Sequence, residues 1–412
     1  MPQSQASLST PRVHKPAPSP LAVYWDLDPA VTFLNHGSFG GCPRVVVAAQ
    51  RAIQDELERE PVRFLHRELE QRLDVAREAL CEVVDCDPQD LVFVRNATEG
   101  VNTVLRSLQF APGDELLTID HEYNATQNAM RFVAERSGAR VVVAHVPFPI
   151  HDPAQVTAAL LAAATPRTKL VVIDHITSPT GIVLPIAEIV RAFEARGIDT
   201  LVDGAHGPGM VPLSLRTLGA AYYTGNCHKW LCTPKGSALL FVRKDRQTRI
   251  RPLAISHAAN TTRKDRSFFW QEFDWTGTFD PSPVLAIPAA LTFLRGLMPG
   301  GIAGLQQHNR SLALAARRLL CRTLGVDEPA PESMIGFLAS VPLPQDRLLA
   351  GPPVEPLGLD PLHHALMQQH GIEVPVMNWP SPRVRLIRVA PQAYNSMEQY
   401  EALAAALRGF SD

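Results

Sequence analysis

The chain has 412 residues, of which 46% are hydrophobic and 19% are charged, so it can bury the core of a large domain and a smaller one. Its 39 Lys and Arg residues nearly balance its 41 Asp and Glu residues. No chain-wide positive charge therefore favours nucleic acid or anionic membranes, and we expect neither as a partner. Only six of the cations are lysines, so chemistry that requires a primary amine has few candidate residues.

The N-terminal segment is rich in Ser, Pro and Gln and lacks the apolar run of a signal peptide. We expect residues 1–30 to form a flexible arm. No stretch of about 18 apolar residues indicates a membrane span. The six cysteines form no C-x-x-C pair, which favours a reducing, cytoplasmic location.

From Val31 onward, short apolar runs alternate with helical patterns. The runs lack polar alternation, as is typical of parallel strands covered on both faces. The sequence therefore predicts an α/β fold with a large, doubly wound, mainly parallel sheet domain over residues 31–287. The expected strands are Leu91–Val94, Glu115–Ile119, Arg140–Val146, Leu170–Asp174, Thr200–Val202 and Ser237–Val242. The expected helices are Thr98–Leu108, Asn124–Arg136, Pro153–Ala164 and Pro185–Arg196.

A polar connection over Lys244–Arg266 follows the last of these strands, and another helix is expected to begin near Pro283. The final part, Pro361–Asp412, has the pattern of a helix, a strand and a helix. We expect a smaller C-terminal α+β domain over residues 288–412.

Ligands of open α/β sheets bind beyond the carboxyl ends of the strands. Ala97 and Thr98 follow the first strand and begin a helix, where Thr98 is the expected cap. The free N–H groups of such a turn suit a phosphate, although most caps bind nothing. Tyr123 follows the next strand and is a core residue, a rim residue or a platform for a flat ligand.

Asp203 ends an apolar run, and Gly204 and Gly207 behind it are expected to leave open space. A buried acid needs a partner such as a metal, a cation or a protonated ring nitrogen, unless it caps the following turn. Lys229 lies beside His228 and Trp230, surroundings that can lower the pKa of an amine and free it to act as a nucleophile. The alternative is an ordinary surface lysine, which fits Lys15, Lys244 and Lys264 better.

Pyridoxal phosphate would explain these signals together. It requires a lysine for a Schiff base, an acid at its ring nitrogen, a phosphate site at a helix start and a flat group against its ring. Lys229, Asp203, the Ala97–Thr98 turn and Tyr123 would supply the four.

Four motifs add a resemblance that covers nearly the whole chain after the arm. The motifs are Asn35–Ser38 (NHGS), Asn96–Gly100 (NATEG), Asp203–His206 (DGAH) and Thr224–Trp230 (TGNCHKW). In this order they resemble the class V aminotransferases, which are fold-type I pyridoxal phosphate enzymes, and within them the isopenicillin N epimerase-like branch. Segments Glu60–Phe64, Thr177–Gly181 and Asp274–Thr278 strengthen the likeness.

The resemblance implies roles around the cofactor ring and its phosphate. Lys229 would form the Schiff base and move the Cα proton, Asp203 would pair with the ring nitrogen, and His206 would lie near the ring hydroxyl. Tyr123 stands where the family places its ring-stacking residue, often a histidine. The residues that would hold the phosphate are Ala97, Thr98, Thr224 and His228.

The resemblance also implies a partner subunit and a substrate site. Thr278 matches a position that reaches the phosphate of a neighbouring subunit, so a homodimer with shared active sites is expected. Arg388 would grip the α-carboxylate of a small amino-acid substrate, for which its planar fork is suited. Asn35 and Ser178 would line the substrate side.

The predicted activity is chemistry at Cα or Cβ of an amino acid, as in isopenicillin N epimerase-like enzymes. Epimerisation needs a second base, for which Tyr123 and His36 are the candidates. A C–S lyase acting on a cysteine conjugate or sulfoxide is the main alternative and needs only Lys229 and a leaving group. A persulfide-forming desulfurase is disfavoured, because no cysteine follows Cys321.

Two further classes receive less support. A metal-dependent hydrolase would use Asp203, His206, His228 and His175, but no recognised metal motif supports it, and we predict no metal site. A non-catalytic binding protein would need neither Lys229 nor Asp203.

Overall fold

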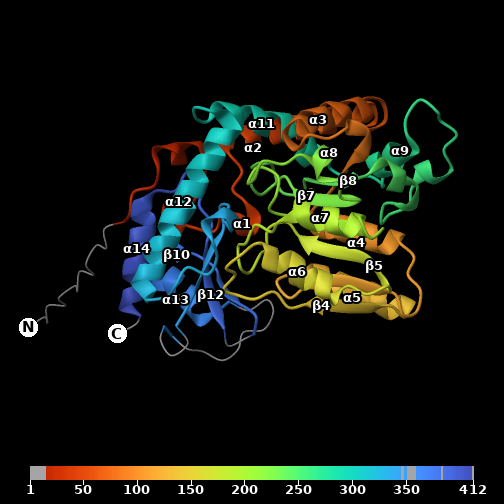
Figure 1. Cartoon of the computed structure of the whole chain (residues 1–412). Coiled ribbons are helices and arrows are strands. Elements are labelled where there is room, and N and C mark those ends of the chain that lie inside the picture. Colours follow the sequence, from red (N-terminus) through yellow and green to blue (C-terminus); the bar gives the residue numbers. More distant parts are fainter. Residues whose placement is uncertain (1–14, 345–347, 350–358, 382–383, 411–412) are drawn as a thin grey trace, which may run out of the picture.

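The computed structural model describes residues 15–344, 348–349, 359–381 and 384–410 (Figure 1). Its main sheet has seven strands in the order β2-β8-β7-β6-β5-β3-β4. The strands are β2 (Leu91–Val94), β3 (Glu115–Ile119), β4 (Arg140–Ala144), β5 (Thr168–Asp174), β6 (Asp199–Asp203), β7 (Tyr222–Asn226) and β8 (Ala238–Val242). β8 runs antiparallel to the other six strands, which all run in one direction. The predicted doubly wound, mainly parallel sheet is confirmed.

Helices cover both faces of this sheet. Successive residues of β5 belong to different clusters: Leu170 and Val172 pack with α4 and α5, whereas Val171 and Ile173 pack on the opposite face with α6 and α7. This is why the strands are apolar without alternation. The helices of this part are α2 (Arg44–Arg59), α3 (Leu69–Val84), α4 (Ala97–Ser107), α5 (Asn124–Ser137), α6 (Ala154–Ala163), α7 (Ile186–Glu194), α8 (Leu215–Leu218) and α9 (Phe268–Asp274).

The C-terminal part contains a small antiparallel sheet in the order β11-β12-β9. Its elements are α10 (Ser282–Leu285), α11 (Ile287–Gly296), α12 (Gly301–Leu324), β9 (Ala339–Pro342), α13 (Pro361–His370), β10 (Ile372–Glu373), β11 (Val376–Asn378), β12 (Arg385–Val389) and α14 (Met397–Gly409). In Figure 1 the long helix α12 lies beside α14, and the two are in contact. This smaller part agrees with the expected second domain, whose boundary at residue 288 stays a prediction.

The N-terminal segment is tied to the C-terminal part. β1 (Thr32–Phe33) pairs with β10, and α1 (His36–Phe39) follows directly. Within the arm expected over residues 1–30, Trp25 is buried and packs edge-on against Phe293 and Tyr394. The last part of that segment therefore packs on the rest of the chain, while residues 1–14 lie outside the described part.

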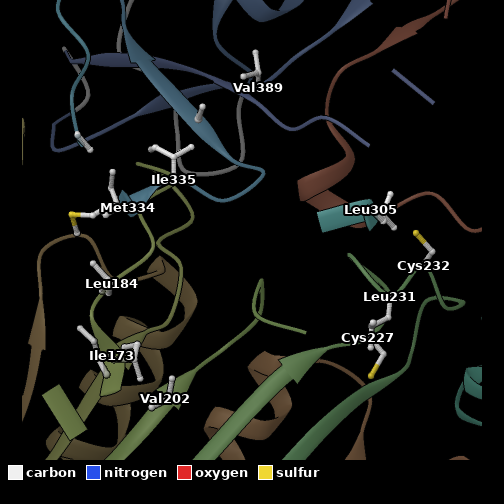
Figure 2. Close-up of a cluster of buried hydrophobic side chains, with 14 of the residues drawn as sticks. Ile173, Leu184, Val202, Cys227, Leu231, Cys232, Leu305, Met334, Ile335 and Val389 are labelled. Carbon is white, nitrogen blue, oxygen red and sulfur yellow. The ribbon is translucent and has the colours of Figure 1, made fainter. Parts of the chain in front are cut away.

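The apolar core continues from the main sheet to the smaller one. Figure 2 shows Ile173 and Val202 of the main sheet, Ile335 before β9 and Val389 of β12 in the same group of buried side chains. This continuous core holds the C-terminal part against the carboxyl edge of the main sheet. Among the described residues, no single helix is both long and apolar enough to cross a membrane.

The sequence-based elements needed two corrections. The sequence predicts a functional motif and no strand at Tyr222–Asn226, but this segment forms β7, an interior strand of the main sheet. The cap of α4 is Asn96, whose side chain accepts the Glu99 backbone N–H at 2.9 Å, and Thr98 lies inside the helix. An Asn is an equally good cap, and it stands one residue before the first helical turn.

Candidate active site

A cavity of about 330 Å³ lies at the carboxyl edge of the main sheet. Residues that follow β2, β3, β5, β6 and β7 line it, because these five strands run in the same direction. The described residues lining it include the predicted Ala97, Thr98, Tyr123, Ser178, Asp203, His206, His228 and Lys229. They also include residues that the sequence reasoning missed, among them Arg95, Asp174, Asn226 and Lys235.

Lys229 points its amine at a histidine whose tautomer the structure fixes. The Nζ of Lys229 lies 3.0 Å from Nε2 of His206, and the Trp230 indole donates to His206 Nδ1 at 3.2 Å. Because Nδ1 accepts, a neutral His206 carries its hydrogen on Nε2 and donates it to the lysine lone pair. Burial and, secondarily, the Arg388 charge lower the pKa of Lys229 to about 7. A large fraction of Lys229 is therefore unprotonated near neutral pH and can act as a nucleophile.

Asp203 is fixed by two donors. The Thr126 hydroxyl in the first turn of α5 donates to Oδ2 at 2.8 Å, and the Ala205 backbone N–H donates to Oδ1 at 3.1 Å. Burial raises the pKa of this carboxyl, while both hydrogen bonds act in the opposite direction. No described cation forms an ion pair with Asp203 within 4.0 Å, so a buried anion faces the cavity without an immediate counter-ion.

The N-terminus of α4 forms another wall. The Ala97 backbone N–H already donates to Asn226 Oδ1 at 2.9 Å, whereas Thr98 is exposed at the cavity rim. The helix dipole there still favours an anion. Thr224 does not line the cavity, because its hydroxyl donates to Leu239 O at 2.9 Å. The Thr224 side chain packs directly against Gly100 of α4, where a Cβ atom would collide with it. Thr224 therefore sets how closely α4 approaches the sheet.

Tyr123 and His228 occupy cavity positions of different character. Tyr123 is 43% exposed at the rim, a position compatible with a platform for a flat ligand. His228 Nδ1 lies 3.2 Å from Ser237 O, and burial lowers the pKa of its ring to about 4. His228 is therefore neutral at physiological pH and can donate from one ring nitrogen only.

Arg388 of β12 is a buried cation with neutral hydrogen-bond partners. Its Nη1 donates to the backbone oxygen and the hydroxyl of Ser178 at 2.6 and 3.0 Å, and Nη2 donates to Ser38 Oγ at 3.2 Å. Its Nε has no partner among the described residues. Burial lowers the pKa of Arg388 to about 10. A buried guanidinium without a carboxylate partner among the described residues could receive an incoming anion.

Besides Thr224 and Arg388, the predicted residues Asn35 and Thr278 lie outside the cavity lining. Asn35 is buried and binds Ser38 at 2.6 Å and Glu373 at 3.0 Å, so it positions Ser38. Thr278 is exposed in the turn after α9, and its predicted contact with a neighbouring subunit stays a prediction.

His36, a suggested second base, has both ring nitrogens engaged. Nδ1 lies 2.8 Å from the Tyr394 hydroxyl, and Nε2 lies 2.9 Å from the Lys229 backbone oxygen. Because burial also lowers the pKa of His36 to about 3, this residue is not available as a base.

The prediction that Gly204 and Gly207 leave open space around Asp203 is wrong. A Cβ on Gly204 or Gly207 would lie about 2 Å from the Tyr223 ring or hydroxyl, closer than atoms can approach. These glycines thus make room for the Tyr223 side chain, whose hydroxyl lies 3.0 Å from His175 Nδ1.

The histidines of the metal-hydrolase alternative are also engaged elsewhere. His206 contacts Lys229 and Trp230, His175 contacts Tyr223, and His228 contacts a backbone oxygen. Among the described residues, the group with metal-binding spacing is instead three carboxylates, Glu122, Asp174 and Asp203.

Comparison with known proteins decides the family. The model of "Aminotransferase class-V" matches residues 40–332. This chain belongs to the class-V aminotransferase family. It is a pyridoxal phosphate-dependent enzyme, as predicted, and Lys229 and Asp203 lie within the matched segment.

Relatives within the class-V family cover almost the whole chain. An isopenicillin N epimerase of Amycolatopsis lactamdurans is 34% identical over 399 residues, which are 93% of this chain and 96% of that protein. A probable L-cysteine desulfhydrase of Arabidopsis thaliana is 30% identical over 403 residues, covering 93% and 83%. The solved complex of the cystine C–S lyase C-DES with cysteine persulfide has a TM-score of 0.74 at 24% identity, covering 93% and 98%, and supports the fold.

The donor set of the cavity fits this family's cofactor. A free amine, a buried carboxylate without a counter-ion, an aromatic ring at the rim and a helix N-terminus all face one space. Lys229 would hold the aldehyde carbon of pyridoxal phosphate, Asp203 its ring nitrogen and the start of α4 its phosphate.

Proposed function

We propose that this class-V enzyme removes the Cα proton of a small amino acid whose carboxylate is held by Arg388, and that its reaction is isopenicillin N epimerase-like. The observation that carries this proposal is that Lys229 lines the cavity, while the buried Arg388, which forms no ion pair with a described carboxylate, donates to Ser178 and Ser38 in the wall of the same cavity. When bound, pyridoxal phosphate supplies an electron-withdrawing ring that makes the Cα–H bond acidic.

The residues of this chain supply the remaining steps. Arg388 would orient the substrate through its carboxylate, with Ser38 and Ser178 holding the guanidinium in place. Lys229, as a free amine, would accept the Cα proton and return it, and His206 would hold the amine through Nε2. Tyr123 stays the candidate for proton delivery from a second face, because it lines the cavity and His36 does not.

A C–S lyase is the second candidate, and the cysteines support it over a desulfurase. Burial raises the pKa of Cys227 to about 12 and also raises that of Cys232, so neither is a thiolate at neutral pH. Cys321 is buried in α12. A lyase needs no such thiolate, only Lys229 and a leaving group on Cβ.

One experiment separates the two reactions. The holoenzyme is offered D- and L-amino acids and cysteine conjugates, while Cα deuterium exchange and the release of pyruvate or ammonia are followed together. Exchange without release supports the epimerase, and release supports the lyase. Lys229→Ala should abolish both while the chain stays folded, and undiminished turnover of this variant would contradict the proposal.

We further propose a cytoplasmic homodimer with shared active sites. The six cysteines are free thiols in the structure, in keeping with a reducing compartment. At the cavity rim, Phe39 is 74% exposed and Tyr123 is 43% exposed, and Thr98 is exposed beside them. A second subunit that covers this rim would bury these side chains and close the phosphate end of the site.

A further inference from the structure

Two buried carboxyl groups beside the site have no role in the proposed reaction. Asp174 is the last residue of β5 and lies in register with Asp203 of β6, and Glu122 follows β3. One oxygen of each of these three groups lies within 4.8 Å of the other two. Glu122 and Asp174 are each only 3% exposed. Three carboxylates cannot all be ionised at this spacing away from water.

The hydrogen bonds show how Glu122 and Asp174 are accommodated. Glu122 Oε2 accepts the Asp174 backbone N–H at 2.9 Å and the Thr118 hydroxyl at 3.2 Å. Glu122 Oε1 and Asp174 Oδ2 are buried without a donor in the part of the chain that the structure describes. If one of the two carboxyl groups is protonated, it can donate a hydrogen bond to the other, so that these oxygens no longer lack a partner.

The surroundings indicate which group carries that proton. Glu122 already accepts two hydrogen bonds, which favour its ionised form, whereas the Asp174 carboxyl receives none from the described donors. Burial, followed by the charge of Glu122, raises the pKa of Asp174 well above its usual value. Burial and the charge of Asp203 raise the pKa of Glu122 to about 7. Above that pH the pair holds one proton and one negative charge.

We propose that Asp174 and Glu122 are positioning residues, an acid–carboxylate pair whose negative charge lies behind Asp203 and strengthens protonation of the ring nitrogen that Asp203 contacts. The inference rests on the proposed cofactor geometry. A second nearby anion makes a cationic ring harder to deprotonate, and a protonated ring withdraws electrons from Cα more strongly. The charged groups that face the pair are Asp203 from β6 and Lys229 after β7.

The test reads the ring nitrogen directly. The holoenzyme is prepared with pyridoxal phosphate isotopically labelled at that nitrogen, and nuclear magnetic resonance follows its protonation against pH. Glu122→Gln keeps the shape of the side chain and removes its charge, so the nitrogen should lose its proton about one pH unit lower than in the wild type. Cα deuterium exchange should slow several-fold. The matched control is Asp120→Asn on the same loop, whose carboxylate contacts His145, and it should titrate like the wild type.

A second measurement tests the pair without the cofactor reaction. Infrared spectra of the full chain recorded above pH 7, where Glu122 is ionised, should contain the C=O band of a protonated carboxyl group, and Asp174→Asn should lower the intensity of that band. An unchanged infrared spectrum in Asp174→Asn, or wild-type nitrogen titration in Glu122→Gln, would overturn the inference. If Glu122→Gln does not fold, the double variant Glu122→Gln/Asp174→Asn removes the same charge and is used in the titration instead of the single variant. Wild-type protein that binds no pyridoxal phosphate would refute the proposed function itself, and the inference with it.

Discussion

Replacing Arg388 with Met tests whether this buried cation serves the substrate or the fold. Its pKa falls from 12.5 to about 10 on burial. At about 1.4 kcal/mol per pH unit, the buried charge destabilises the folded chain by about 3 kcal/mol. Because the folded pKa is the lower one, this penalty is fully present below pH 10 and therefore at neutral pH. The three hydrogen bonds to Ser178 and Ser38 return about 1 kcal/mol each. Arg388→Met should thus change the free energy of unfolding by no more than about 1 kcal/mol.

Substrate binding should respond very differently. Two charge-assisted hydrogen bonds to a carboxylate contribute about 1.5–3 kcal/mol each, so Arg388→Met should weaken amino-acid binding by about 100- to 10,000-fold. Urea unfolding measures the stability, and titration of the holoenzyme's visible spectrum with amino acids measures the binding.

The same strand offers a matched control for Arg388. Arg385, also buried in β12, forms an ion pair with Asp360 at 3.2 Å. Arg385→Met leaves that buried carboxylate without this partner and should destabilise the fold by about 3–5 kcal/mol. The reasoning is refuted if Arg388→Met unfolds as easily as Arg385→Met, or if it binds amino acids like the wild type.

Three further variants or conditions probe other parts of the argument. Since burial lowers the pKa of Lys229 to about 7, reaction of the cofactor-free protein with pyridoxal phosphate should accelerate as pH rises through 7 and level off above it; a stopped-flow profile with a midpoint near 10 would contradict this. Arg77→Met breaks a fully buried pair with Asp274 and should lower the free energy of unfolding by about 3–5 kcal/mol, against at most about 1 kcal/mol for Arg263→Met on the surface. Phe39→Asp should convert the proposed dimer to a monomer in light scattering, and an unchanged mass would refute that surface as the interface.

The main sheet and the candidate site residues Asp203 and Lys229 were predictable because each depends on local sequence. Asp203 ends an apolar strand of a parallel sheet, and such strands present their last and following residues at one edge. Lys229 is conspicuous for another reason, because lysine is rare in this chain and this one lies beside His228 and Trp230. Asp174 ends an equally apolar strand and carries the same sequence signal as Asp203. β7 was missed because its Tyr222–Asn226 segment combines polar and small residues, although every one of them is buried.

Contacts between distant segments could not be predicted in the same way. Arg388 binds Ser178 across 210 positions of sequence and Ser38 across 350. A motif can suggest that an arginine meets a carboxylate, but only the packing of β12 against the start of the chain shows that its partners are neutral. Likewise, the role of Gly204 depends on the ring of Tyr223 from a neighbouring strand, which no local pattern reveals.

The charges left unneutralised at the cavity predict how its ligands act on stability. Within the described part of the chain, Asp203 forms no ion pair with a cation and Arg388 forms none with a carboxylate. Burial and then the charge of Arg388 lower the pKa of Lys229, whereas the charge of Asp203 raises it. Each ligand that brings the missing charge should therefore stabilise the fold, by about 2.7 kcal/mol at 100 times its dissociation constant. A simple organic acid without an amino group should raise the unfolding temperature through Arg388 alone and should lose this effect in Arg388→Met. Pyridoxal phosphate should stabilise Arg388→Met as it does the wild type. If Arg388→Met lost its stabilisation by pyridoxal phosphate as well as by the organic acid, the charges of Arg388 and of the acids around Asp203 would not act separately.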